Sequence, residues 1–350
     1  MSKSKKLIFL LSSVLAVILI TLISIWVVIG QKTQGYECTN YAMGTFVQQT
    51  VYGAKRVDAA TVAAKSIGEL ENLISWRVDD SDIARLNEAA GSDWTKLDPK
   101  TIALLQKTLD VSEKSGGALD PTILPISSMW DFGGSNQRVP SKEEIQKYIK
   151  YVDYRNLRLN LTESSASLKN HYMAVDLGAV GKGAACDEAV AAYKSVGAQS
   201  GIVAVGGSVG VFGTKPDGAP WHIAVRDPNS NEDQGAAMGT VDLTSGYIST
   251  SGTYEKNFTE NGVTYHHLLN PKTGYPENNG LLSVTVVCDN GALSDALSTA
   301  CFILGRENGM KLLEQYNAGG IFIDTNNKVY RSERLKNQFT IAKNRYTLAE

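Results

Sequence analysis

The spacing of hydrophobic positions along this chain changes several times between the 3.6-residue period of helices and the two-residue period of strands. The helical repeat is clearest in residues 58–75, 99–115, 141–151, 182–196 and 294–304. Runs typical of strands cover residues 45–52, 202–205, 223–225, 265–269 and 281–287. Short strands joined by glycine turns, at Gly206-Gly207 and Gly274, fit hairpins better than regular βαβ repeats. The pattern predicts an α+β fold with mixed or antiparallel sheets and packed helices.

The first thirty residues have a different pattern. Lys3, Lys5 and Lys6 precede residues 7–30, a run without a single charge. At ~1.5 Å per residue, a helix over this run is longer than the ~30 Å hydrocarbon core of a bilayer. The lysines predict a cytoplasmic N-terminus and an extracytoplasmic chain after about residue 31. We expect a single-pass protein of the cell membrane, with a cytoplasmic stub and transmembrane anchor (1–30), a short linker (31–40) and one large domain (41–345).

The residues that follow the apolar run argue against removal of this anchor. The exit sequence VVIGQKTQGYECTN contains no small-residue cleavage site of the A-x-A kind. Cys38 suggests a lipid-modified protein, but Tyr36 and Glu37 precede it and it lies well beyond the apolar run. The sequence therefore favours an uncleaved anchor.

Composition and charge narrow the classes of function. Hydrophobic residues make up 43% of the chain, enough for one large domain or two closely joined subdomains. The 34 basic and 36 acidic residues give a net charge of −2 without a basic cluster, which argues against nucleic-acid binding. The four cysteines lie far apart without a C-x-x-C pair, so we expect no zinc site. A disulfide between Cys288 and Cys301 stays open for an extracytoplasmic domain.

The segment NFTENGVTYHHLLNPKTGYP (257–276) combines two histidines with turn residues at the end of a predicted strand. Side chains alternate along a strand, so His266 and His267 point to opposite faces. The turn sequence from Asn270 to Gly274 places His267 at the end of a rigid element, where an imidazole can act as a base. Taken alone, such a pair is more typical of ordinary cross-strand residues.

Two glycine-rich segments resemble ligand-binding loops in composition. Residues 175–183, VDLGAVGKG, predict a strand, a turn and a helix start that direct backbone N–H groups toward an anion such as phosphate. A nucleotide-triphosphatase loop is excluded, because Asp176 and Gly183 occupy positions that need Gly and Ser or Thr. In GGALDP (116–121), the backbone can approach a ligand closely and Asp120 can accept hydrogen bonds from a base or a ribose. Plain connecting turns, with Lys182 in solvent, remain the alternative for both segments.

The predicted helix 294–304 is apolar on nearly every face, so its polar residues need partners. Asp295 and Thr299 are four positions apart and share one face, which places a carboxylate about one turn from a hydroxyl. Such oxygen ligands suit a hard cation such as Mg²⁺. The alternative is an N-terminal cap made by Ser294 and Asp295, which leaves Thr299 unexplained.

In their order along the chain, seven short motifs resemble the ApbE family, the FAD:protein FMN transferases, over essentially all of the chain after the predicted anchor. They are AMGT (42–45), GALDP (117–121), VDLGAVGKG (175–183), the pair at 206–207, TSGTY (250–254), YHHLLNPKTGYP (265–276) and SDALSTA (294–300). The resemblance implies a T-fold-like α+β architecture, with FAD as substrate and Mg²⁺ as cofactor. It also implies transfer of the FMN moiety of FAD to a Thr or Ser hydroxyl of a partner flavoprotein, with release of AMP.

The resemblance further implies roles for individual residues. His267 is the general base that takes the proton of the acceptor hydroxyl. The metal is held by the carbonyl of Ala179 and the side chains of Asp295 and Thr299. The residues expected to bind FAD are Met43, Trp76, Ala118, Leu119, Asp120, Asp176, Lys182 and Leu268.

The chain departs from the family pattern at four positions. Thr253 replaces the Asp of TSGDY, Leu119 replaces the usual Phe, and Ala204 and Ser208 stand where Asn or Asp often occur. These differences bear on acceptor positioning more than on FAD or metal binding. Two other functions stay open: hydrolysis of FAD to FMN and AMP, and extracytoplasmic flavin binding without turnover. No acceptor-type flavin domain is fused to the chain, so we expect the acceptor to be a separate protein.

Overall fold

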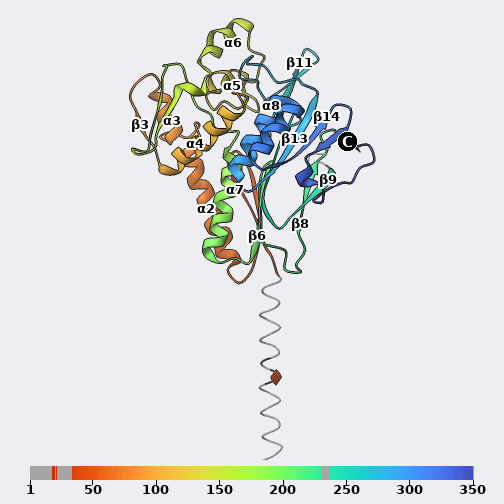
Figure 1. Cartoon of the computed structure of the whole chain (residues 1–350). Helices are drawn as coiled ribbons and strands as arrows, with labels where there is room; N and C mark the ends of the chain where they lie inside the picture. Colours follow the sequence, from red (N-terminus) through yellow and green to blue (C-terminus); the bar gives the residue numbers. More distant parts are fainter. Residues whose placement is uncertain (1–17, 20, 22–33, 231–235, 350) are drawn as a thin grey trace, which may run out of the picture.

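The computed structural model describes residues 18–19, 21, 34–230 and 236–349 (Figure 1). Its central element is a nine-stranded sheet in the order β1-β2-β6-β7-β10-β13-β14-β15-β17. Neighbouring strands are antiparallel except for the terminal pair, β15 and β17. The strands are β1 (Tyr36–Ala42), β2 (Thr45–Tyr52), β6 (Ser200–Val205), β7 (Ser208–Phe212), β10 (Ser245–Gly252), β13 (Leu281–Cys288), β14 (Gly319–Asp324), β15 (Lys328–Arg331) and β17 (Thr347–Leu348).

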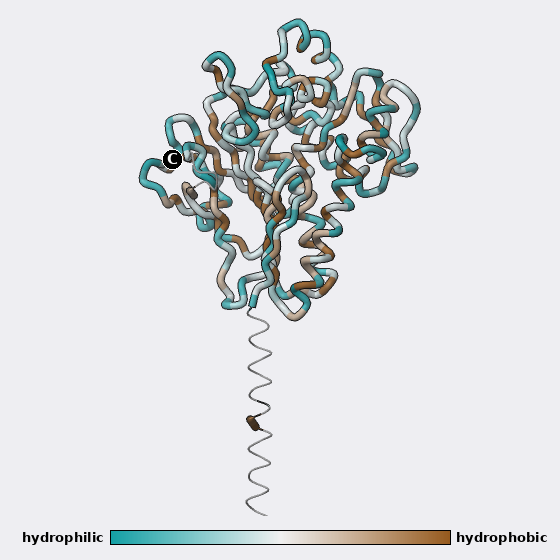
Figure 2. Tube along the Cα trace, turned by 180° about the vertical axis from the view of Figure 1, so that it is seen from behind, coloured by the Kyte–Doolittle hydropathy of each residue, from teal (hydrophilic) through white to brown (hydrophobic). Residues whose placement is uncertain are grey.

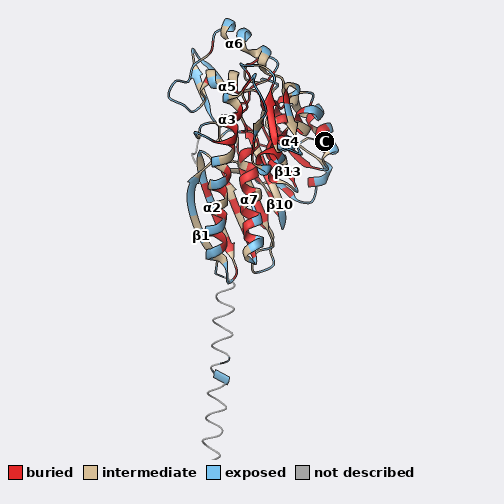
Figure 3. Cartoon of the chain, turned by 90° about the vertical axis from the view of Figure 1, so that its left-hand side faces the viewer, coloured by how far each residue is buried: buried red, intermediate tan, exposed pale blue. Residues whose placement is uncertain are grey.

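Three long helices pack on one face of this sheet: α2 (Arg56–Ile74), α7 (Gly181–Val196) and α8 (Gly291–Gln315). Figure 3 shows α2 and α7 side by side, with α7 buried along much of its length. Side chains alternate across the strands, so Val284 and Val286 pack toward the helices and Val287 toward the opposite face.

A small three-stranded sheet, in the order β16-β9-β8, covers that opposite face. Trp221 and Val241 of the small sheet share a second hydrophobic core with Ile321 and Ile323 of the large one. In Figure 2 the hydrophobic segments concentrate between these layers, and the outer loops are mostly hydrophilic. The small sheet consists of β8 (Trp221–Arg226), β9 (Ala237–Leu243) and β16 (Phe339–Ile341).

Most of the remaining elements gather at one end of the large sheet, around the labels α3, α5, α6 and β11 in Figure 1. Trp130 is the centre of a third, aromatic core there with Phe258, Tyr265 and Tyr275, and its Nε1 donates to the carbonyl of Gly274 at 2.9 Å. This bond fixes the turn that follows His267. The elements of this region are α3 (Asp82–Glu88), β3 (Thr95–Lys96), α4 (Pro99–Lys114), α5 (Leu124–Trp130), α6 (Lys142–Tyr148), η1 (Ile149–Tyr151), η2 (Tyr154–Asn156), β4 (Leu157–Asn160), β5 (Ser165–Leu168), β11 (Asn257–Glu260) and β12 (Val263–His266). The 3₁₀ turn η3 (Glu333–Leu335) belongs instead to the second hydrophobic core, through Leu335.

The α+β prediction is confirmed, and the predicted helices and strands are present with shifted ends. Helix α8 begins three residues earlier than predicted and continues beyond a break at Gly305 (φ 75°, ψ 173°). Strand β1 occupies residues 36–42, which overlap the predicted linker 31–40. All seven residues pair with β2, but the sequence did not indicate a strand because they lack a clear apolar alternation. The four cysteines are free thiols, so the disulfide between Cys288 and Cys301 is not formed.

The predicted transmembrane anchor, residues 7–30, lies outside the described residues except for positions 18, 19 and 21. Within the part of the chain that the structure describes, no helix has the length and apolar character needed to cross a bilayer.

Candidate active site

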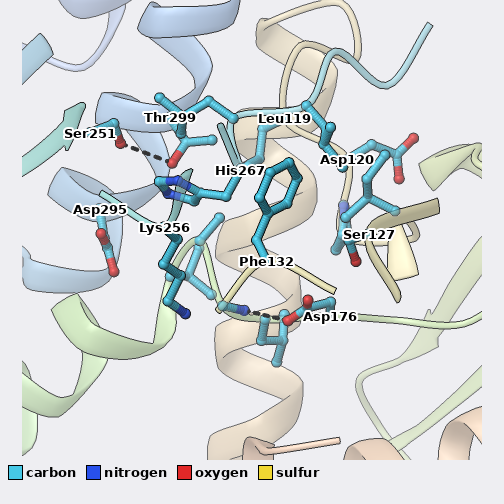
Figure 4. Close-up of a pocket in the computed structure, with 18 of the residues that line it drawn as sticks. Leu119, Asp120, Ser127, Phe132, Asp176, Ser251, Lys256, His267, Asp295 and Thr299 are labelled. Atoms are coloured by element: carbon cyan, nitrogen blue, oxygen red, sulfur yellow. Dashed lines mark hydrogen bonds between the residues drawn. The ribbon is translucent and has the colours of Figure 1, made fainter. Parts of the chain in front are cut away.

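A single pocket collects side chains from segments far apart in the sequence (Figure 4). Figure 4 shows Asp295, Thr299 and His267 on one side of it, and Leu119, Asp120 and Ser127 on the other. The predicted site residues among those that line the pocket are Trp76, Ala118, Leu119, Asp120, Asp176, Ala179, Lys182, His267, Leu268, Asp295 and Thr299.

Met43 is the predicted site residue that does not line the pocket. It occupies the two-residue turn between β1 and β2 with a left-handed backbone (φ 55°). Its Cε lies 3.0 Å from the position that a Cβ on Gly181 would take, so its side chain packs against the start of α7. The structure therefore places Met43 behind the pocket wall, where it supports Gly181.

Two helices, α7 and α8, cap each other at their N-termini. The Asp295 carboxylate on α8 accepts from the N–H of Gly183 at 3.0 Å. In return, Asp187 on α7 accepts from the N–H groups of Gly291 and Ala292 at 2.8 and 2.9 Å. These bonds satisfy donors that the first turn of a helix leaves free. The alternative interpretation of Ser294 and Asp295 as the cap of their own helix is wrong, since the cap residue of α8 is Asn290.

Close contact between the two helices depends on glycine. A Cβ on Gly183 would lie 2.0 Å from the carbonyl oxygen of Gly291 and 2.8 Å from the Cβ of Asp295. A Cβ on Gly291 would lie 2.1 Å from the carbonyl oxygen of Gly183. Any side chain at either position would separate the helices and move Asp295 relative to Lys182.

The reciprocal capping leaves the carbonyl of Ala179 free. The N–H of Gly183 would bond this carbonyl in a regular helix, four residues back, but it bonds Asp295 instead. No hydrogen bond to the Ala179 oxygen is formed within the described residues. Thr299, one turn beyond Asp295, shares a hydrogen bond with Ser251 at 3.2 Å. Carbonyl, carboxylate and hydroxyl oxygens thus line the same pocket, and all three suit a hard divalent cation.

Charges in this part of the pocket are coupled. Asp295 raises the pKa of Lys182, opposing the effect of burial, and Glu255 acts in the same direction. Burial raises the pKa of Asp295 itself, and Lys182 limits that rise. The pair stabilises both ionised forms in a site that water reaches poorly.

His267 lies one residue beyond the end of β12, with its Nδ1 3.1 Å from the carbonyl oxygen of Glu255. A carbonyl only accepts, so Nδ1 carries the hydrogen and Nε2 keeps its lone pair. Burial, reinforced by the charges of Lys182 and Lys256, lowers the pKa of His267 to about 3. The ring is therefore neutral at physiological pH and presents Nε2 as a proton acceptor.

The neighbouring His266 faces away from the pocket, as the strand alternation predicts. It is 8% exposed and its ring meets Phe302 edge to face, with centroids 5.8 Å apart. Its Nδ1 has no hydrogen-bond partner among the described residues, and burial lowers its pKa. The interpretation as an ordinary packed histidine thus applies to His266, whereas His267 lines the pocket.

The carboxylate of Asp120 is occupied by its own loop. It accepts from the N–H and hydroxyl of Thr122 at 2.8 and 2.6 Å, and from the N–H of Tyr154 at 2.9 Å. Burial raises its pKa. Asp120 therefore shapes the loop, and the adjacent residues Ala118 and Leu119 provide much of the pocket surface.

The lining residues that were absent from the sequence prediction include Arg77, Phe132, Glu255 and Lys256. Arg77 covers the ring of Trp76 at 4.1 Å. Phe132 stacks on Trp130 with centroids 5.4 Å apart and reaches the middle of the pocket in Figure 4. Lys256 directly follows the motif TSGTYE, so the sequence could have indicated that it lies in the site. No nearby motif indicates the same for Phe132.

Carboxylates outnumber cations around the pocket. The cations are Arg77, Lys182 and Lys256, and the carboxylates are Asp120, Asp131, Asp176, Glu255 and Asp295. When all are ionised, two negative charges are in excess, which is the charge that one divalent cation neutralises.

Two of the departures from the family pattern have defined contacts. Ser208 donates to the Asp295 carboxylate at 3.3 Å, so it supports the oxygen-rich part of the pocket. The Thr253 hydroxyl contacts the carbonyl of Leu282 at 3.4 Å and does not line the pocket.

Comparisons with known proteins agree with this geometry. A family model described as the ApbE family matches residues 43–322. The FAD:protein FMN transferase of Treponema pallidum (strain Nichols) is 29% identical, over 91% of this chain and 92% of its own length. The FAD:protein FMN transferase of Escherichia coli (strain K12) is 28% identical, over 81% and 83%.

Solved structures give the same result. The ApbE protein of Thermotoga maritima superposes with a TM-score of 0.80 at 31% identity, covering 87% of this chain and 98% of its own. The flavin transferase ApbE of Vibrio cholerae gives a TM-score of 0.77 at 25% identity, with 87% and 99% covered. On the sequence match and the shared fold together, this chain belongs to the ApbE family.

Proposed function

We propose that this chain is an FAD:protein FMN transferase, which moves the FMN moiety of FAD to a Thr or Ser hydroxyl of a partner flavoprotein and releases AMP. The observation that carries the proposal is the meeting, in one pocket, of a neutral histidine with a free Nε2 and three oxygen ligands for a divalent cation. The relatives from Treponema pallidum and Escherichia coli have the same activity in their names.

Transfer of this kind exchanges one phosphorus–oxygen bond for another. The acceptor oxygen attacks the phosphorus on the FMN side of the pyrophosphate, the bond from this phosphorus to the bridging oxygen breaks, and AMP leaves. Nε2 of His267 receives the hydroxyl proton, because its lone pair is directed away from the bond between Nδ1 and Glu255. The ordering of the imidazole by a backbone carbonyl keeps the same tautomer before and after each turnover.

Mg²⁺ fits the oxygen atoms of Ala179, Asp295 and Thr299, and we include it in the proposed reaction. The unused Ala179 carbonyl and the excess of negative charge around the pocket both support a bound divalent cation. Bound there, Mg²⁺ would neutralise charge on the pyrophosphate oxygens. The capping bond from Gly183 holds the Asp295 carboxylate in place for this role.

The test compares transfer with its two alternatives. The purified full-length chain is incubated with FAD, Mg²⁺ and an acceptor flavoprotein, and in parallel with an acceptor whose target Thr is replaced by Val. We expect flavin bound covalently to the intact acceptor alone, together with AMP. Free FMN in both samples would instead show FAD hydrolysis. Bound FAD without any product would show a flavin-binding protein.

We also propose that the catalytic domain lies outside the cytoplasm, attached through residues 7–30. The support is the uncharged run after Lys3, Lys5 and Lys6. The acceptor would then be a separate membrane-associated or exported flavoprotein. N-terminal sequencing of the mature protein, combined with protease digestion of intact cells, tests this location. A mature chain that begins after residue 30, or a domain protected in intact cells, would contradict it.

A further inference from the structure

Arg77 and Lys256 are two cations in the pocket to which neither the sequence nor the proposed mechanism gives a role. Within the described residues, neither forms an ion pair with a carboxylate within 4.0 Å. Lys182 also forms no ion pair within that distance among these residues, but Asp295 is the largest cause of the rise in its pKa. Two positive charges therefore face the pocket without a close protein counter-ion.

Lys256 is held in an unusual backbone conformation next to the proposed base. Its φ of 37° lies in the left-handed region, which is unfavourable for a residue with a side chain. Two hydrogen bonds fix the surrounding turn: Nδ1 of His267 donates to Glu255, and the side-chain amide of Asn257 donates to Thr253 at 3.0 Å. The position of Lys256 is thereby tied to that of His267.

The side chain of Lys256 extends from this turn into the pocket. Its Cγ lies 3.9 Å from the position of a Cβ on Gly133, so the loop after α5 borders the stem of the side chain. Figure 4 shows the ammonium directed from beside His267 toward the side of the pocket that holds Asp176. All three cations line this pocket. Burial and then the charges of Lys182 and Arg77 lower the pKa of Lys256, and Asp176 and Glu255 oppose that shift. An anionic ligand in the pocket would relieve the repulsion between the cations.

Resting on the function proposed above, we propose that Arg77 and Lys256 form a phosphate seat, which binds the pyrophosphate of FAD and places its FMN-side phosphorus beside His267. Lys256, adjacent to the base, contacts the phosphate that is attacked. Arg77, held over the Trp76 ring on the other side, contacts the phosphate that leaves with AMP. The flavin and adenine rings have no part in this seat, so it recognises any ligand with a diphosphate.

The test uses three ligands that separate the phosphates from the flavin: FAD, ADP and riboflavin. Their affinities are measured on the full-length chain by calorimetry, for wild type, Lys256→Gln, Lys256→Arg and Arg77→Gln. Lys272→Gln is the matched control, because Lys272 is also exposed and near His267 in sequence but does not line the pocket. Folding of each variant is checked by its melting temperature.

We expect Lys256→Gln to weaken FAD and ADP about tenfold, equal to about 1.4 kcal/mol, and to leave riboflavin unchanged. Arg77→Gln should act in the same direction with a smaller effect, since Arg77 contacts the phosphate that leaves and not the one that is attacked. Lys256→Arg should restore most of the affinity, and Lys272→Gln should behave as wild type. Raising the salt concentration should weaken FAD binding more in wild type than in Lys256→Gln.

Two results would overturn the seat: equal affinities of wild type and Lys256→Gln for FAD and ADP, or an equal loss for riboflavin, which would indicate a structural role. The proposed function fails separately. If the wild-type chain bound FAD and ADP through Lys256 but formed no protein-bound flavin on an acceptor, the seat would stand and the flavin transferase proposal would fall.

Discussion

The two walls of the pocket are built in different ways. One, the helix wall, consists of Ala179, Lys182, Asp295 and Thr299 at the starts of α7 and α8, where reciprocal capping and glycine contacts hold the two helix starts together. The other, the loop wall, consists of Leu119, Phe132, Glu255 and Lys256, carried by turns that contain left-handed backbone conformations.

This difference separates two tasks of the site. A divalent cation needs oxygen ligands at fixed distances, and helix starts locked together meet that need. A large ligand such as FAD must enter and leave, and loops accommodate such movement better than packed helices. We therefore propose that the helix wall neutralises charge and that the loop wall recognises FAD. His267 lies on the side of Asp295 and Thr299 but is held by the loop residue Glu255, so it connects the two walls.

The largest expected effect is at His267. His267→Asn removes the proton acceptor, so the transfer rate should fall by about 10²–10⁴ while FAD affinity stays close to that of wild type. His266→Asn, in the packed position against Phe302, should have a milder effect on rate. Rates come from covalent flavin on the acceptor, and affinities from calorimetry. Similar losses in the two variants, or loss of FAD binding in His267→Asn, would remove the assigned role.

Replacing Asp295 tests the helix wall. Asp295→Asn keeps an oxygen to accept from Gly183 but removes the charge, so the Mg²⁺ concentration that gives half-maximal transfer should rise about a hundredfold. Thr299→Val is of similar size but lacks the hydroxyl, and it should raise this concentration about tenfold or less. Mg²⁺ removal should also lower the melting temperature of wild type more than that of Asp295→Asn. The same metal dependence in all three proteins would leave Asp295 with the role of helix cap alone.

The contact between the two helices can be broken without touching a charged group. Gly183→Ala would place a Cβ against the Gly291 carbonyl, so it should destabilise the fold by at least about 1–3 kcal/mol. Gly68→Ala is the matched control on α2, where a Cβ would meet nothing within 4 Å, and it should be neutral or stabilising by up to about 1 kcal/mol. Urea unfolding of the two variants measures both. Equal stability would show that the crossing tolerates a side chain.

The smallest expected effect is that of pH on the base. The pKa of His267 is lowered to about 3, so kcat/KM should show no loss near pH 6.5, where an ordinary histidine gains its proton. Between about pH 6.5 and 3, His267 binds a proton in the unfolded chain but not in the folded chain. The free energy of unfolding should therefore decrease as the pH falls through this range. Profiles of kcat/KM and melting temperature against pH test this point, and a loss of kcat/KM centred near pH 6.5 would contradict it.

The sequence predicted the helix wall better than the loop wall, for a physical reason. Asp295 and Thr299 are linked by helical spacing, and Lys182 lies in a glycine turn, so local pattern was enough. The start of α8 was misplaced because Asp187, which caps it, is more than a hundred residues away. The contribution of Arg77, Phe132 and Lys256 depends on loops that meet only in the folded chain, one of them with an unfavourable φ at Lys256. The local sequence pattern cannot predict contacts between loops that are far apart in the sequence.

The most direct test of the central claim is the stoichiometry of AMP to attached flavin. The full-length chain is given FAD and Mg²⁺, with and without an acceptor flavoprotein, and AMP, free FMN and protein-bound flavin are quantified together. If the site transfers FMN to a hydroxyl by way of His267, AMP should appear in equal amount to bound flavin, only with the acceptor, and not in His267→Asn. AMP released with free FMN at the same rate in the absence of acceptor would contradict the account.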